Sequence, residues 1–190
     1  MSVFRLVCGI IVVFALWACG NQESPPVDPA AFGVHGVDMC QVLHQQEVDD
    51  LLQHAAGSGR SQTLGSGIRQ CAWPSQGVPE LVLQLVPSGR GGVQTAAAVG
   101  EGFLVLDVPD MGTAAAVSVL NAAVGSGLEA NVGILALAVG NQILRIAPLK
   151  LSIARDSERY QALLVLGKAV TSRLRDAEVG KSTSQLEPST

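Results

Sequence analysis

The segment HQQEVDDLLQH places His44, Glu47 and His54 where they could do acid–base chemistry. A histidine and a glutamate three residues apart share one face of a helix and can exchange a proton. His54 follows His44 by ten residues, or about 15 Å along a helix, so the two histidines cannot bind one metal ion. Alternatively, Glu47 caps the helix by reaching back to an unpaired backbone N–H. We favour capping, and an enzyme with a polar site near His44, Glu47 and His54 is the alternative.

Other catalytic patterns are absent from the sequence. It contains no G-x-S-x-G, H-E-x-x-H or phosphate-binding G-x-x-x-x-G-K motif. Asp107 and Asp110 flank Pro109 and could form a weak cation site, but a solvated turn is the simpler interpretation. We therefore predict no catalytic residue, no cofactor and no metal ligand. We favour a non-enzymatic function over an enzymatic one.

Cys19 stands where an apolar run gives way to polar chain. Arg5 precedes this run, which extends from Leu6 to Trp17 and is shorter than the ~20 residues that span a bilayer as a helix. Leu16 and Ala18, three places and one place before the cysteine, resemble the bacterial lipobox. The resemblance implies a signal peptide over residues 1–18 and lipid attachment, including palmitate, at Cys19. An ordinary secretory signal and an uncleaved anchor are the alternatives.

Residues 19–36 would then form a lipidated, flexible tether. Residues 20–31 contain three prolines, one serine and two acidic residues, a composition typical of extended linkers. Each buried acyl methylene contributes about 0.8 kcal/mol, so the lipid would supply the affinity for the membrane. Gly20 is not the aspartate that commonly retains lipoproteins at the inner membrane. We expect the chain in the bacterial cell envelope, on the inner leaflet of an outer membrane and facing the periplasm if the host has one.

The composition indicates one folded domain. The 190 residues are 48% hydrophobic and 15% charged, which argues against disorder and against the basic surface of a nucleic-acid binder. The net charge is -4, and loss of Arg5 with the signal peptide would make it -5. We expect a single domain over residues 37–176 and a disordered tail over residues 177–190.

Two cysteines remain once Cys8 is cleaved and Cys19 is acylated. In an exported, oxidising setting, Cys40 and Cys71 are expected to form a disulfide. Zinc would need further ligands at a suitable spacing, which the neighbouring histidines do not provide. Trp73 follows the second of these cysteines by two residues and is expected to pack in the core, with a binding-site aromatic as the alternative.

Hydrophobic periodicity and turn residues predict the elements. Helices are expected at 45–56, 93–100, 111–127 and 156–174, the last capped by Asp156 or Ser157. Strands are expected at 68–74, 80–87, 102–108, 132–139 and 142–149, with 60–67 as a loop. Strands 68–74 and 80–87 should form one hairpin. Strands 132–139 and 142–149 should form another, through Gly140 and Asn141. The fold class is α+β, with an antiparallel sheet of about four to five strands, helices packed on one face and one disulfide.

The pattern Cys40-x-x-Leu43-x-x-x-Glu47-Val48, followed by Cys71-x-Trp73, resembles a group of small secreted bacterial lipoproteins of unknown function. The similarity spans residues 38–174. It implies an exported α+β domain with a disulfide between the two motif cysteines, and no established catalytic residue. The expected function is therefore that of a membrane-anchored envelope lipoprotein. Beyond the membrane itself, its expected partner is an envelope protein, a glycan or a lipid, and no nucleic acid.

Overall fold

The computed structural model describes residues 36–120, 132–151, 153–155 and 157–184. The expected signal peptide, the lipidated Cys19 and nearly all of the tether lie outside the described residues. The elements follow in the order α1 (Gln45–Leu52), β1 (Arg60–Thr63), a 3-10 turn η2 (Gly65–Gly67), β2 (Arg69–Ser75), β3 (Val78–Pro87), α2 (Gly92–Ala97), β4 (Phe103–Asp107), β5 (Ala115–Leu120), β6 (Val132–Val139), β7 (Gln142–Pro148) and α3 (Glu158–Ser184).

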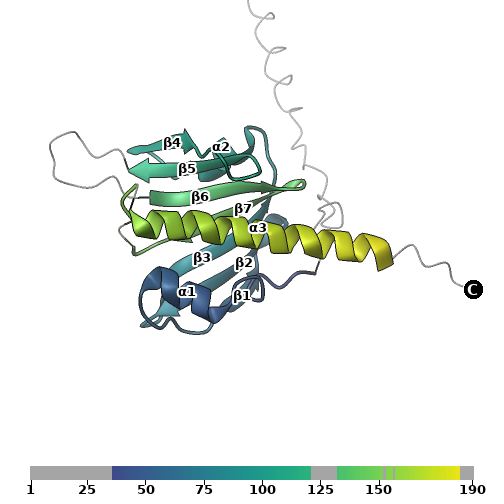
Figure 1. Cartoon of the computed structure of the whole chain (residues 1–190), viewed down its shortest axis with the longest axis horizontal. Coiled ribbons are helices and arrows are strands. Elements are labelled where there is room, and N and C mark those ends of the chain that lie inside the picture. Colours follow the sequence, from purple (N-terminus) through teal and green to yellow (C-terminus); the bar gives the residue numbers. More distant parts are fainter. Residues whose placement is uncertain (1–35, 121–131, 152, 156, 185–190) are drawn as a thin grey trace, which may run out of the picture.

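The strands form one antiparallel sheet in the order β1-β2-β3-β7-β6-β5-β4. The α+β class and the antiparallel sheet are confirmed, but the expected four to five strands are too few, because the sheet has seven. Both expected hairpins are present: β2 pairs with β3, and β6 pairs with β7. Figure 1 shows α3 lying across the middle of the sheet, with α1 beside it near β1 and β2.

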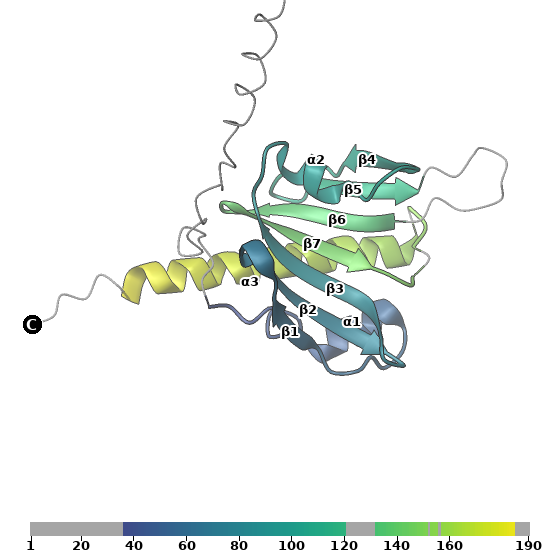
Figure 2. The ribbon, with the colours of Figure 1, turned by 180° about the vertical axis from the view of Figure 1, so that it is seen from behind.

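We expected the helices to pack on one face of the sheet, and this expectation is wrong. Gly167 of α3 approaches Leu135 and Leu137 of β6, whereas α2 packs against Ala136, the residue between them. Successive side chains of a strand point to opposite faces of the sheet. The α2 helix therefore covers the face opposite to α1 and α3, over β4 to β7 (Figure 2).

The main core lies between the sheet and the two helices α1 and α3. It contains fully buried residues from β2, β3, β6 and β7, together with Leu163, Val170 and Leu174 of α3. The hydroxyl of Ser157 accepts a hydrogen bond from the Tyr160 N–H at 3.1 Å, which confirms the expected cap of α3. This helix continues past Leu174 to Ser184. Residues 177–184, which we predicted to be disordered, are therefore helical. Residues 185–190 lie outside the described residues.

Two segments that the sequence analysis assigned otherwise are strands. Part of the stretch 111–127 that was expected to be a helix forms β5, in which residues 115–119 are all buried, and residues 121–127 lie outside the described residues. Both faces of this strand are covered, so its sequence shows no alternation, and Ala116 opposite Ala136 leaves room for α2. The second segment is β1, expected to be part of a loop: all four of its residues are exposed, and backbone pairing with β2 holds it in place.

Candidate functional site

Cys40 and Cys71 form a disulfide, as predicted, with their Cα atoms 5.0 Å apart. The bond joins the segment before α1 to strand β2. Cys71 is fully buried, and Trp73 is only 1% exposed. Gly59 lies against both, because a Cβ at this position would be 2.6 Å from the Cys71 Sγ. The two cysteines and the tryptophan therefore belong to the core, and the prediction that Trp73 packs there is confirmed.

Glu47 is held by the structure around it. Its Oε2 accepts a hydrogen bond from the His44 N–H at 2.8 Å, which confirms the expected capping of α1. The Arg173 guanidinium of α3 donates to both carboxylate oxygens at 2.7 Å and also to the Val42 carbonyl at 2.8 Å. The hydrogen bond from Arg173 is the main reason that the pKa of Glu47 is lowered. A carboxylate held in its ionised form is poorly suited to general acid–base catalysis near neutral pH.

His54 lies beyond the other end of α1 and has a different partner. Its Nε2 is 2.9 Å from Oε2 of Glu80, a carboxylate that is 13% exposed. The eight-residue helix between the two histidines is about 12 Å long. The structure thus brings His44 and Glu47 together and leaves His54 apart, so these three residues do not share one site.

A row of polar side chains crosses four strands. Gln70 donates to Gln62, Gln84 donates to Gln70, and the Arg145 guanidinium donates to Gln84, at distances of 2.9 to 3.0 Å. These residues are direct neighbours in the register of β1, β2, β3 and β7. Partial burial lowers the pKa of Arg145. The row links adjacent strands on the side of the sheet opposite to α1 and α3.

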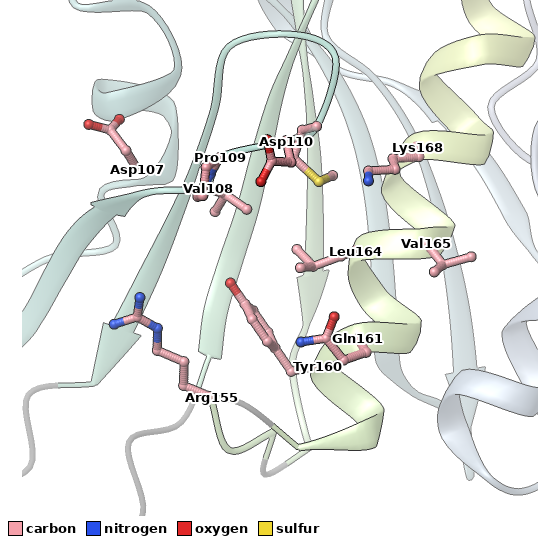
Figure 3. A pocket seen from close by; sticks show the side chains of 11 residues that line it. Asp107, Val108, Pro109, Asp110, Arg155, Tyr160, Gln161, Leu164, Val165 and Lys168 are labelled. Carbon is pink, nitrogen blue, oxygen red and sulfur yellow. The ribbon is translucent and has the colours of Figure 1, made fainter.

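A pocket of about 330 Å³ lies between the N-terminal half of α3 and the loop that follows β4. Volumes of about 300–1,000 Å³ are typical of small-molecule sites. In Figure 3, Asp110 of the β4 loop and Lys168 of α3 lie toward the same end of this pocket, and the Tyr160 hydroxyl points toward the β4 loop. Arg155 extends from the segment just before α3. The pocket therefore brings together ionic groups from three segments that are far apart in the sequence.

The two aspartates of the expected acidic turn have different surroundings. The Asp107 carboxylate accepts a hydrogen bond from the Gln94 side chain of α2 and points away from the other pocket residues in Figure 3. Asp110 adopts a left-handed backbone conformation, with φ 61°, and lines the pocket. Within the described ranges, no three histidine, cysteine, aspartate or glutamate side chains gather as a metal site would require.

The cationic part of this pocket was not found from the sequence. Arg155 and Lys168 are thirteen positions apart and belong to no motif. The one sequence signal was the acidic loop at Asp110, interpreted as a solvated turn.

We found no family model, curated protein or solved structure that matches this chain. None of the helices described by the structure has the length and the apolar character needed to cross a bilayer.

Proposed function

We propose that this chain is a lipid-anchored lipoprotein of the bacterial cell envelope. Its domain has no catalytic role and binds an envelope protein, a glycan or a lipid at the membrane surface. The observation that carries the proposal is the lipobox-like run from Leu16 to Cys19, which precedes a domain closed by a disulfide. Disulfides persist in exported proteins and are rare in the cytosol, so this bond supports an extracytoplasmic location.

Two observations support binding over catalysis. Glu47, the carboxylate of the enzymatic alternative, is committed to the cap of α1 and to Arg173. His54, the other residue of that alternative, pairs with Glu80 beyond the far end of α1. The resemblance to small secreted lipoproteins, carried by Cys40, Cys71 and their neighbours, supports the same assignment. Gly20, at the position after Cys19, supports the inner leaflet of the outer membrane, facing the periplasm, if the host has an outer membrane.

We place the docking surface on the exposed side of α3, next to the pocket. Val165 lines the rim of this pocket and is 66% exposed, the largest exposure among the large hydrophobic residues in the described part of the chain. The tether before residue 37 would let this surface move relative to the membrane.

Site-specific photocrosslinking in intact cells tests this function. A photoreactive residue at position 165 should give adducts of defined mass, whereas one at Val78, which is 48% exposed and outside the pocket, should give none of them. The adducts should decline when Cys19→Ala removes the lipid site. Equal labelling from positions 165 and 78, or labelling that is indifferent to Cys19→Ala, would contradict the proposal.

A further inference from the structure

Strand β4 is an edge strand without the features that usually protect one. In Figures 1 and 2 it lies at the border of the sheet, and β5 is its one neighbour in the described sheet. Its sequence is FLVLD, with no lysine and no proline, and its ladder with β5 has no bulge. Natural edges are commonly shielded by such features, because an exposed apolar edge pairs readily with another strand.

The backbone of β4 is positioned for such pairing. The Val108 N–H donates to the Ala115 carbonyl at 3.0 Å, just beyond the end of the ladder between β4 and β5. The hydrogen-bonding groups of an antiparallel strand alternate in direction from one residue to the next. Those of residues 104 and 106 therefore point to β5, and those of residues 103, 105 and 107 point to the open side of the sheet.

The side chains at the two ends of β4 have partners inside the domain and leave the open side clear. The Phe103 ring reaches β6, where its Cε1 is 2.9 Å from the position that a Cβ on Gly133 would occupy. The Asp107 carboxylate accepts a hydrogen bond from the Gln94 side chain of α2. Leu104 is 50% exposed, because β5 covers it from one side only. The edge thus offers free backbone groups beside an exposed leucine.

We propose that a second copy of this chain pairs with β4, antiparallel and in register about Val105. In this arrangement Val105 lies opposite Val105 of the second copy, and Phe103 lies opposite Asp107. The backbone groups of all three residues point to the open side, so they can form the hydrogen bonds of the new ladder. Leu104 lies opposite Leu106 of the second copy, which covers its exposed side chain. The two seven-stranded sheets then form one continuous sheet.

The residues of β4 favour pairing with a second copy in the antiparallel direction. Like charges that lie directly opposite each other destabilise a sheet. Antiparallel pairing about Val105 places each Asp107 opposite Phe103, whereas parallel pairing in register would place the two aspartates side by side. The apolar residues meet apolar residues, because Leu104 and Leu106 face each other twice across the two-fold axis.

The other edge of the sheet explains why the assembly should stop at two chains. The four residues of β1 are all exposed, and their sequence RSQT offers no apolar side chain to Leu104. Pairing of β4 with β1 would be head-to-tail and would build an open filament. Pairing of β4 with β4 uses the apolar edge of both copies and leaves only the two polar edges free. This inference goes beyond the proposed function, because it requires neither the lipid anchor nor a foreign partner.

Sedimentation equilibrium of the full chain tests the inference, with protein purified from membranes in a detergent matched to the density of the solvent. The ladder is five residues long, so the interface is small and we expect a dissociation constant on the order of 10 μM. At about 100 μM most chains should therefore have twice the mass of one chain. A single-chain mass at that concentration, or a mass that rises beyond two chains, would overturn the inference.

Matched lysine substitutions at the two edges locate the contact. Leu104→Lys should return the mass to that of one chain, because pairing would bury the added charge beside Leu106 of the second copy. The single chain should fold, since this position is half exposed. Ser61→Lys adds the same charge to the exposed β1 edge and should leave the twofold mass unchanged. Equal loss of mass in the two variants would show that the added charge, and not β4, governs association, and would overturn the inference.

A cysteine substitution tests the register without Leu104→Lys. In the proposed ladder the two Cα atoms at position 105 are about 5.5 Å apart, which is within the range that a disulfide can bridge. Oxidised Val105→Cys should therefore migrate as a linked pair of chains on a non-reducing gel. Ser61→Cys is more exposed but lies on the other edge, so it should stay unlinked. Equal linkage of both variants would indicate random collision and would overturn the inference.

The two proposals fail separately. Specific photocrosslinking at Val165 together with a single-chain mass would remove this inference and leave the proposed function. A twofold mass that depends on Leu104, without any specific adduct at Val165, would support this inference and contradict the proposed function.

Discussion

Reduction of the Cys40–Cys71 disulfide should lower the free energy of unfolding by about 3.7 kcal/mol. The bond closes a loop whose ends are 31 positions apart. For that length, the chain-entropy relation gives about 12 cal/mol/K, or about 3.7 kcal/mol at 25 °C. Reduction removes the cross-link while both sulfur atoms stay in place, so the buried Cys71 site loses no volume. The loss should therefore come from the greater conformational freedom of the unfolded chain.

Urea denaturation of the oxidised and reduced protein measures this loss. A chain with Cys19→Ala, which has no acylation site, avoids the need for detergent. In a second measurement, the midpoint of thermal unfolding of the reduced protein should lie about 10 °C below that of the oxidised protein. For a chain of this size, a loss of 1 kcal/mol lowers the midpoint by about 3 °C. Cys40→Ala/Cys71→Ala should reproduce the result to within about 1 kcal/mol. A loss below about 1 kcal/mol would refute the reasoning, because the unfolded chain would then not be constrained by the bond.

Two further predictions concern stability. Glu47→Gln should cost about 1–2 kcal/mol, because it weakens the charge-assisted contact with Arg173 in a partly exposed setting. The pKa of Glu47 is lowered from 4.5 in the folded state, so its contribution is complete above about pH 5 and is lost as the pH falls through the folded-state pKa. The gap between wild type and variant in urea melts should therefore close in acid, and a gap that stays constant down to pH 3 would contradict this. Gly59→Ala should cost about 1–3 kcal/mol by overpacking against Cys71, whereas Gly65→Ala, whose Cβ would meet nothing within 4 Å, should change stability by less than about 0.5 kcal/mol. Equal losses in the two glycine variants would show that the close contact at Gly59 is not the cause.

The hairpin through Gly140 and Asn141 could be predicted because the sequence carries its signals locally. Two apolar runs of strand length flank a dipeptide that suits a tight turn, and β6 and β7 form there. The cap of α1 was equally local, because Glu47 reaches only to position 44. The ion pair with Arg173 was not predictable, since its two residues are 126 positions apart and meet only through the packing of α3 on α1.

Strand β5 could not be predicted because its burial removes the pattern on which prediction depends. Ala116 and Val117 point to opposite faces of the sheet, yet both are buried, so no alternation of polar and apolar residues appears. Alanine also has the highest helix propensity, and the tertiary packing overrides it here. The pocket could not be predicted for a related reason: Asp110, Arg155 and Lys168 come to line one pocket only when α3 docks beside the β4 loop.

The intact mass of the protein extracted from membranes, measured before and after reduction, tests the proposed lipid anchor most directly. We predict a chain that begins at Cys19, carries acyl groups on that residue and gains two hydrogens when the bond between Cys40 and Cys71 is reduced. A chain with an unmodified Cys19, or one that retains residues 1–18, would contradict the proposal that this domain is held at the membrane by a lipid.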